Sequence, residues 1–330
     1  MGAGSAARVT ETETKIARQD CQRPPAMARR MAQCGARLEA DREATVSEEG
    51  ATWTASPALI DMGSPEPAPP LLLRGDLDGV ATLTLNRPAA RNALSFAMLG
   101  ALGDALAGIA ADDSVRVVIL AAEGPVFCAG HDLREITAHR DDADGGRGFF
   151  DATMRRCAQV MRAIVALPQP VIAQVQGVAT AAGCQLVATC DLAVASDQAR
   201  FCTPGVDIGL FCSTPAVALS RAVAAKPAME MLLTGGMIGA DHAERIALVN
   251  RVVPHDDLAT ATMDLARGIA ARSAHTVRLG KAAFHRQRGL PLDRAYEHCT
   301  AVMTENLLAE DAIEGIGAFL AKRAPVWKDR

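Results

Sequence analysis

The sequence predicts an α/β domain followed by an all-helical region. Two observations lead to this prediction. Between residues 80 and 254, short apolar or alternating runs typical of strands take turns with longer segments of helical period. From residue 255 onward almost every segment has the helical period. The chain has 330 residues, of which 49% are hydrophobic and 22% charged, so it has enough apolar surface for one full-sized core.

The first elements of the α/β domain are expected from Leu71 onward. Val80 to Leu85 alternates as a half-buried strand does, and Ser95 offers an N-cap to a helix from Phe96 to about Ala110. Val115 to Ala121 is apolar except for Arg116, which predicts a strand buried on both faces. After it we expect a long helix, a second buried strand, a loop of small residues and a short helix, covering residues 149–167, 171–175, 177–183 and 186–189.

The second half of the chain is expected to be mostly helical. Short strands are predicted at residues 192–195 and 249–253. Between them Ser213 or Thr214 can cap a helix that has Pro215 in its first turn. The C-terminal region should hold four helices, covering residues 258–271, 279–287, 292–308 and a last segment that ends near Arg323.

The chain is therefore divided into residues 1–70, 71–254 and 255–330. Residues 1–70 have no sustained apolar period and end in a proline-rich stretch, so we predict a disordered extension. A short amphipathic helix around Met27 to Leu38 is an alternative for part of it. Its acidic residues argue against a transit peptide, which is nearly free of acids.

Composition excludes several kinds of partner. The net charge of -4 and the pI of about 6.0 give no basic field for nucleic acid or an anionic membrane. No apolar stretch reaches the roughly 18 residues that span a bilayer. The nine cysteines form neither a CxxC pair nor a zinc-ligand spacing, so we expect reduced buried thiols and no metal. These features favour a small-molecule partner and the cytoplasm, with the mitochondrial matrix as the alternative.

Two loops concentrate the chemistry. Residues 123–133 follow a buried strand and lead into a helix, and Ala181 to Gly183 opens another helix. Helix N-termini present free N–H groups and favour negative charge. If the loops converge, they form an oxyanion hole, which contributes on the order of a few kcal/mol per donor. On spacing alone, tight strand-to-helix turns are the simpler interpretation.

The same segments resemble a known family. Asn86 to Ser95, Phe127 to Leu133 and Gly177 to Asp191 are similar to the crotonase (enoyl-CoA hydratase/isomerase) superfamily, over about residues 71–330. Four blocks, from residue 123 to the C-terminus, are closer still to one branch of it. The resemblance implies a crotonase-type spiral of ββα units with a helical C-terminal trimerisation region. It also implies assembly as a homotrimer or a dimer of trimers.

The resemblance further implies a partner and its contacts. The partner would be an acyl-CoA thioester whose carbonyl oxygen accepts from the backbone N–H groups of His131 and Ala182. No cofactor is implied beyond the CoA moiety of the substrate. The residues that match family contacts to CoA are Ala90, Arg91, Ala93 and Ala129, with Phe319 and Lys322 reaching from a neighbouring subunit. For one of these residues, Lys322, a solvated charge at the end of a helix is an equally good interpretation.

Two positions depart from the family pattern. Family hydratases use two glutamates for acid/base catalysis, and this chain has Gln185 and Gly205 there. A glutamine amide has no useful basicity and glycine has no side chain. General acid/base catalysis contributes on the order of a hundred- to ten-thousand-fold per group, so hydration by the usual mechanism should be severely impaired.

Few residues are candidates to replace the glutamates. The imidazole of His131 titrates near neutrality, and Ser213 lies near the nucleophile position of dehalogenase-type members. A backbone donor role and a helix cap, respectively, are the simpler interpretations. Other polar residues nearby are expected to hold turns, cap helices or pack as small side chains. They are Asp132, Asp191 and Asp207 in the first two roles, and Cys184 and Cys202 in the last.

Two functions therefore stay open. In the first, the protein is an enoyl-CoA hydratase/isomerase-like enzyme of fatty-acid or acyl-CoA metabolism with a substituted base. In the second, it is a catalytically weak or inactive protein that binds acyl-CoA or is regulatory. Gln185 and Gly205 favour the second function, whereas the loop pair is compatible with both.

Overall fold

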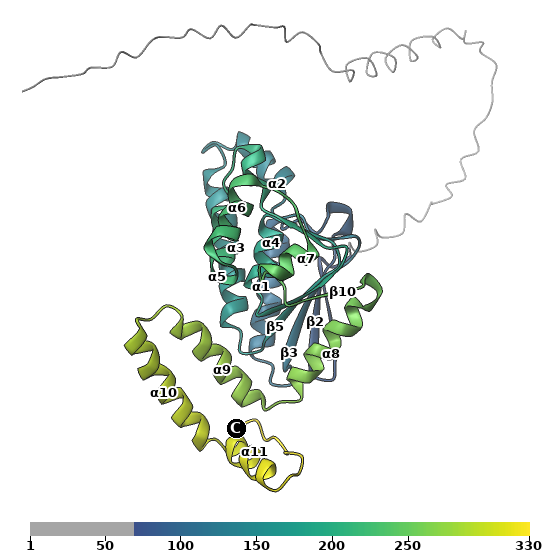
Figure 1. The fold of residues 1–330 in the computed structure, drawn as a ribbon. Helices are drawn as coiled ribbons and strands as arrows, with labels where there is room; N and C mark the ends of the chain where they lie inside the picture. Colours follow the sequence, from purple (N-terminus) through teal and green to yellow (C-terminus); the bar gives the residue numbers. More distant parts are fainter. Residues whose placement is uncertain (1–68) are drawn as a thin grey trace, which may run out of the picture. The chain divides into compact units, whose positions relative to one another are not determined.

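The fold is known from a computed structural model that describes residues 69–330. The predicted disordered extension over residues 1–70 and the alternative helix around Met27 to Leu38 lie outside the described residues, except for Pro69 and Pro70. Figure 1 shows a strand-containing core that is followed by the helices of the C-terminal region. The predicted order of an α/β core and a helical C-terminal region is confirmed.

A six-stranded main sheet forms the centre of the core. Its strand order is β1-β2-β3-β5-β7-β10; β1 pairs antiparallel with β2, and the other pairs are parallel. The strands are β1 (Leu72–Leu77), β2 (Val80–Leu85), β3 (Val117–Ala122), β5 (Val171–Val175), β7 (Leu192–Ser196) and β10 (Arg251–Val253). All but β1 were predicted, with shifts of one or two residues at some ends, because their apolar runs are long enough to recognise.

A second, four-stranded sheet lies along the spiral and was not predicted. Its order is β4-β6-β8-β9, and it consists of β4 (Val126–Cys128), β6 (Val178–Thr180), β8 (Arg200–Cys202) and β9 (Ile238–Gly239). These strands have two or three residues, too few to show a period, so the small residues 177–183 were wrongly assigned wholly to a loop. Each turn of the chain adds one strand to each sheet, in the pairs β3-β4, β5-β6 and β7-β8. This is the expected spiral of ββα units.

Helices complete the turns of the spiral. They are α1 (Phe96–Ala110), α2 (Leu133–Ala138), α3 (Arg147–Ala166), α4 (Ala182–Thr189), α5 (Ser213–Ala222), α6 (Ala225–Thr234) and α7 (Ala240–Arg245), with short 3-10 turns at Pro88–Ala90, His139–Asp141, Pro204–Ile208 and His255–Asp257. Ser95 caps α1 as predicted, since its side chain accepts from Met98 N. The predicted cap of α5 is wrong: the helix begins at Ser213 itself and has Cys212 at its N-cap, without a side-chain hydrogen bond.

Four helices form the C-terminal region: α8 (Leu258–Ala270), α9 (Ala274–Gln287), α10 (Leu292–Leu308) and α11 (Glu310–Leu320). α8 covers the main sheet, where Leu258 and Ala266 pack with Val117 and Ile172 in a second buried cluster. This explains why β3 is apolar on both faces. α9 begins five residues before the predicted start, because Ser273 caps it by accepting from Thr276 N.

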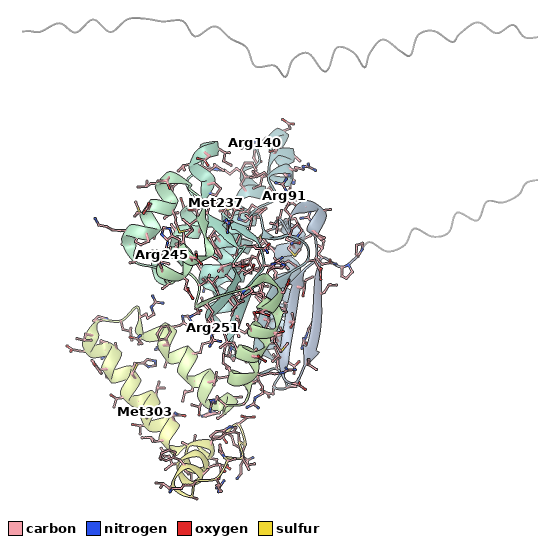
Figure 2. All side chains as sticks on the ribbon, turned by 45° about the vertical axis from the view of Figure 1, so that its right-hand side comes forward. Arg91, Arg140, Met237, Arg245, Arg251 and Met303 are labelled. Atoms are coloured by element: carbon pink, nitrogen blue, oxygen red, sulfur yellow. The ribbon has the colours of Figure 1, made fainter. Side chains whose placement is uncertain are left out.

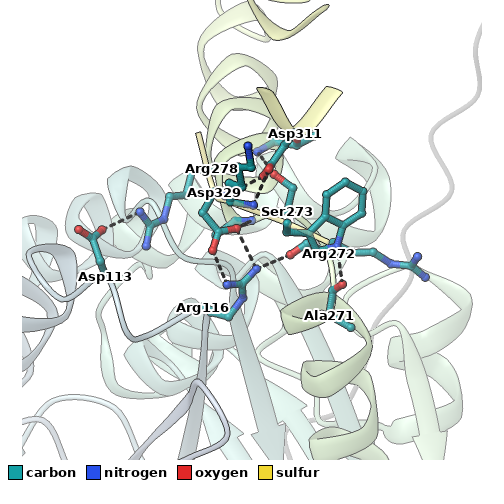
Figure 3. A network of polar contacts seen from close by, with 12 residues as sticks. Asp113, Arg116, Ala271, Arg272, Ser273, Arg278, Asp311 and Asp329 are labelled. Carbon is teal, nitrogen blue, oxygen red and sulfur yellow. Dashed lines mark hydrogen bonds and ion pairs between the residues drawn. The ribbon is translucent and has the colours of Figure 1, made fainter. Parts of the chain in front are cut away.

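A network of polar contacts fastens the end of the chain, as Figure 3 shows. Arg116, next to β3, donates to both carboxylate oxygens of Asp329 at 2.7 and 3.1 Å. Asp329 also accepts from Ala274 N at the start of α9. Asp311 in α11 accepts from the backbone N–H groups of Lys328 and Asp329. The last residues therefore tie α9 and α11 to the edge of the core. Among the described helices, none is both long and apolar enough to cross a membrane.

Candidate active site at the start of helix α4

The two loops singled out in the sequence are in direct contact. Gly130 has a φ of 85°, and a Cβ added there would lie 2.9 Å from Ala181 Cβ and 3.2 Å from Ala182 N. A Cβ on Gly183 would lie 2.1 Å from the carbonyl oxygen of Cys128. The end of β4 and the first turn of α4 therefore approach so closely that only glycine fits at both contact points. The two strand-to-helix turns are therefore packed against each other.

Free backbone donors lie at this contact. Within residues 69–330, the N–H groups of His131 and Ala182 donate to no backbone or side-chain acceptor of the protein. Ala182 is the first residue of α4, so its N–H has no partner inside the helix. Ala181 before it has φ 51° and ψ −117°, a conformation that costs an L-residue on the order of 1–3 kcal/mol. Strain of this kind is concentrated at functional sites.

A turn between β2 and α1 supports the loop of His131. Asn92, with a φ of 52° and no exposed surface, accepts from Arg87 N and donates to the carbonyls of Glu123 and Val126 at 2.8 and 2.7 Å. Leu94 N donates to the carbonyl of Gly130. The amide oxygen and both amide hydrogens of Asn92 are thus engaged in bonds that join the two segments, and the loop has little freedom to move.

Charged groups fix the start of α2 in the same way. Asp132 caps α2 by accepting from Arg134 N and Glu135 N, as predicted, and pairs with Arg87 at 3.1 Å. Burial would raise the pKa of Asp132, but the bonds from Arg87 and the backbone N–H groups outweigh it and hold that pKa below its ordinary value. Glu135 accepts from Phe96 N at 2.8 Å and so joins α2 to α1. The carboxylates of this loop are engaged in structure.

The residues expected to contact CoA fall into two groups. The first group clusters at the same turn: Ala129 N donates to the carbonyl of Arg91, and Ala93 N donates to that of Ala90. Arg91 is exposed there, and Figure 2 shows it on the core. The structure therefore brings together four predicted residues, Ala90, Arg91, Ala93 and Ala129, beside the loop pair.

The second group lies elsewhere in the protomer. Phe319 in α11 is 82% exposed, and Lys322 follows the end of that helix. Figure 2 shows Met303, on the neighbouring helix α10, well separated from Arg91. Within one protomer the structure does not bring Phe319 and Lys322 to the loop pair. Their expected role at a neighbouring subunit stays a prediction.

The two positions that lack glutamate are enclosed. Gln185 lies one turn into α4, is 4% exposed, and has its Oε1 4.0 Å from Cys157 Sγ in α3. Gly205 lies in the 3-10 turn after β8, where an added Cβ would be 2.8 Å from the carbonyl oxygen of Leu210 and 2.9 Å from Cys212 Sγ. A side chain at position 205 would therefore require the loop to shift.

The proposed substitute catalysts differ in their surroundings. The ring nitrogens of His131 are buried, and neither has a hydrogen-bond partner among the described residues. Burial lowers the pKa of His131 below its ordinary value, which favours a neutral ring at pH 7. Ser213 has an exposed side chain whose hydroxyl approaches the carbonyl of Phe211 at 3.4 Å. It is not positioned by a base.

The other residues named from the sequence have structural positions. Cys184 and Cys202 are buried, and burial raises the pKa of both thiols, as expected of packed side chains. Asp191 accepts from Val171 N at 2.8 Å, which joins the starts of β5 and β7 where a turn or helix cap was predicted, and it also pairs with Lys281 and His285 of α9. Asp207 lies in the first turn of a 3-10 helix. Within residues 69–330, no cluster of His, Cys, Asp and Glu is suited to a metal ion.

One buried polar group near α4 has no counterpart in the sequence prediction. Thr153 of α3 is 1% exposed, and its hydroxyl has no hydrogen-bond partner in the described chain. The sequence gives no signal for it, because one threonine on the apolar face of a helix is an ordinary packing residue. Only the placement of α3 beside α4 distinguishes it.

The paired sheets of ββα turns, with helix-opening loops in contact, define a protein of the crotonase fold. Residues 76–330 match the enoyl-CoA hydratase/isomerase family over most of the chain. The chain belongs to this family.

Known relatives agree with the branch that the sequence blocks favour. Enoyl-CoA hydratase domain-containing protein 3 of Homo sapiens, named as mitochondrial, is 49% identical over 251 residues, 76% of this chain and 81% of that protein. The crystal structure of human enoyl-CoA hydratase domain-containing protein 3 has a TM-score of 0.74 and 47% identity, covering 78% of this chain and all of that one, 100%. An enoyl-CoA hydratase structure from Mycobacterium smegmatis is 51% identical with a TM-score of 0.75, covering 78% and 99% of the two chains.

Proposed function

We propose that the protein binds an acyl-CoA thioester at the loop pair of residues 128–131 and 180–183. In this proposal the N–H groups of His131 and Ala182 form an oxyanion hole for the thioester carbonyl. The observation that supports it most is the close contact of Gly130 with the first turn of α4, because His131 follows Gly130 and neither the N–H of His131 nor that of Ala182 has an acceptor among the described residues. Donors fixed in advance stabilise an enolate without reorganising.

The reaction proposed is enoyl-CoA hydratase- or isomerase-like chemistry in fatty-acid or acyl-CoA metabolism. The family and the names of its relatives support this class. Proton transfer is the step without a dedicated carboxylate, because Gln185 can only orient a water molecule and Gly205 has no side chain. Turnover should therefore be slow compared with a hydratase that has both glutamates.

A second function has its own observation. The carbonyl of Leu210 and the sulfur of Cys212 fill the space beside Gly205, so the loop is closed where a catalytic side chain would stand. This favours a catalytically weak or inactive acyl-CoA-binding or regulatory protein. Both functions use the same thioester site, and they differ only in turnover.

The rest of the ligand is assigned by the same proposal. Ala90, Arg91, Ala93 and Ala129 contact the CoA moiety, and no other cofactor is required. Phe319 and Lys322 reach the CoA of a neighbouring subunit in a homotrimer or a dimer of trimers. Lysine suits a phosphate as a point charge. The cytoplasm stays the predicted compartment, although some relatives are named as mitochondrial.

The test measures binding and turnover separately. Calorimetry with crotonyl-CoA and with free CoA asks whether the thioester adds affinity, and loss of the conjugated thioester absorbance reports hydration. We expect tighter binding of the thioester and slow hydration. Thioester binding without turnover would select the second function, whereas equal affinities for the thioester and free CoA would contradict the oxyanion hole.

A matched pair of glycine variants controls for folding. Gly130→Ala places a methyl group against Ala182 N, and Gly145→Ala has a similar positive φ of 67° with nothing within 4 Å. Both variants carry the same backbone strain, so a difference between them reports the loop contact. We expect Gly130→Ala alone to lose thioester-dependent affinity.

A further inference from the structure

The hydroxyl of Thr153 differs from those of four other helical threonines in this protein. Thr189, Thr234, Thr262 and Thr304 each donate to the carbonyl four residues earlier, at 2.7 to 2.9 Å. Thr153 lies within α3 and is as deeply buried as Thr262, yet its hydroxyl makes no such bond. Its side chain is thus turned away from its own helix backbone, and a buried polar group without a partner calls for an explanation.

The register of α3 against α4 locates this hydroxyl. Cys157 Sγ lies 4.0 Å from Gln185 Oε1, and Met161 Sδ lies 3.4 Å from Thr189 Oγ1. From the first pair to the second, each helix advances by four residues, so the two helices run in the same direction and their turns match. Residues four apart lie on one face of a helix. One turn earlier, Thr153 lies level with Ala181, beside the first turn of α4.

The protein offers no acceptor for Thr153 at this place. One turn further along the same face of α3 lies Cys157, a buried thiol whose pKa is raised to about 12 by burial. A neutral thiol is a weak hydrogen-bonding group. The unpartnered hydroxyl of Thr153 therefore belongs to the face of α3 that packs against α4, at the level of the start of α4.

We propose that Thr153 is a substrate-contacting residue whose hydroxyl bonds to an oxygen on the β-carbon of the acyl group. The proposal rests on the proposed thioester site, because the carbonyl held at Ala182 places the next acyl carbons beside the first turn of α4. The ligand class it selects is a 3-hydroxyacyl thioester over a saturated acyl thioester of the same length. Gln185, one turn further along α4, offers the same oxygen a second polar group.

The experiment compares two ligands that differ in one hydroxyl, 3-hydroxybutyryl-CoA and butyryl-CoA, by calorimetry on the full chain. Thr153→Val keeps the shape of the side chain and removes the hydroxyl, whereas Thr153→Ser keeps the hydroxyl. We expect the wild type and Thr153→Ser to prefer the hydroxylated ligand about tenfold, and Thr153→Val to bind both alike. Affinity for butyryl-CoA should not fall in Thr153→Val.

Thr262→Val is the matched control, because Thr262 is equally buried in α8 and bonds to its own helix. It should leave the ligand preference unchanged. An unchanged preference in folded Thr153→Val, with both ligands still bound, overturns the role of Thr153 alone. A wild type that binds neither ligand overturns the thioester site and this inference together. An equal loss of both affinities in Thr153→Val identifies a merely structural threonine, which also overturns the proposal.

Discussion

At position 205 the missing carboxylate and the shape of the neighbouring loop are linked. Leu210 N donates to the carbonyl of Gly205 at 2.9 Å, which folds the loop back on itself and brings the carbonyl of Leu210 and the sulfur of Cys212 against the glycine. A backbone oxygen cannot swing away as a flexible side chain can. The glycine is therefore required by packing, and a side chain cannot be restored there without moving the loop.

We expect Gly205→Glu to lower the free energy of unfolding by about 1–3 kcal/mol, because the new Cβ overlaps the loop backbone. Urea unfolding followed by circular dichroism measures this. Gly108→Glu is the control: Gly108 lies in α1 with nothing within 4 Å, and glutamate favours a helix over glycine, so stability should hold or rise. An undiminished stability of Gly205→Glu would show that the loop opens readily.

The buried ring of His131 predicts a pH dependence of stability. Burial lowers its pKa in the folded protein below the ordinary value of 6.5, so the unfolded chain takes up the proton first as the pH falls. Stability is complete above about pH 6.5 and declines below it, down to the depressed pKa of the folded state. Urea midpoints at pH 7 and pH 5 should therefore differ less in His131→Asn than in the wild type. If the urea midpoint changes equally between pH 7 and pH 5 in both proteins, the lowered pKa of His131 in the folded state is contradicted.

At the scale of elements, a buried ion pair joins the core to the C-terminal region. Lys281 of α9 has a side chain 7% exposed, pairs with Asp191 at 2.7 Å and donates to the carbonyls of Ile164, in the last turn of α3, and Gln169, in the loop before β5. His285 contacts the other oxygen of Asp191 at 3.0 Å. One lysine thus satisfies a carbonyl of the last turn of α3, a loop carbonyl and the carboxylate before β7.

Replacing this lysine should separate α9 from the core. Lys281→Met leaves the carboxylate of Asp191 and two carbonyls without their donor, so we expect a loss of about 3 kcal/mol in the free energy of unfolding. Arg155→Met is the control, because Arg155 pairs with Asp151 on the exposed face of α3 and should contribute nothing measurable. Hydrogen exchange should show the extra opening in α9. An equal loss of unfolding free energy in the two variants would contradict a stabilising contact of Lys281 with the core.

The elements differ in how far the sequence predicts them, for physical reasons. β3 was recognisable because burial on both faces requires a continuous apolar run, and β5 because four of its five residues are apolar. The second sheet was not, since a strand of three residues such as β6 is fixed by its neighbours and has no pattern of its own. In the site, Ala182 and Gln185 could be located from a resemblance. The closure around Gly205 and the free hydroxyl of Thr153 depend on contacts between distant segments, which no local pattern contains.

At the scale of the whole molecule, the C-terminal region presents a large apolar surface. Nothing on α10 is buried, and many apolar side chains of α10 and α11 are exposed. Exposed apolar side chains gathered on neighbouring helices are typical of protein interfaces. The exposed residues include Tyr296, Met303, Leu307, Leu308, Ile313 and Phe319. A second copy of the chain, as in the expected trimer, would cover them.

A charge on this surface should therefore break the assembly. We expect the wild type to sediment as a trimer or a dimer of trimers, and Leu308→Glu with Ile313→Glu to sediment as a smaller species, because both side chains are more than 60% exposed in the protomer and would be desolvated in an interface. Leu77→Glu, at an exposed position on β1, is the control and should leave the assembly intact. A monomeric wild type would contradict the predicted oligomer.

Mixing two defective variants tests whether a neighbouring subunit completes the site. Gly130→Ala has a blocked loop pair but keeps Lys322, whereas Lys322→Glu has an intact loop pair and repels the phosphates of CoA from its neighbour. Neither homogeneous assembly should bind crotonyl-CoA well. After the two are unfolded and refolded together, some subunits combine an intact loop pair with a neighbour that has Lys322, so affinity should be partly regained.

If Lys322→Glu alone binds as the wild type does, the lysine is a solvated charge at the end of α11. If mixing regains nothing although Lys322→Glu is impaired, the lysine acts within its own subunit.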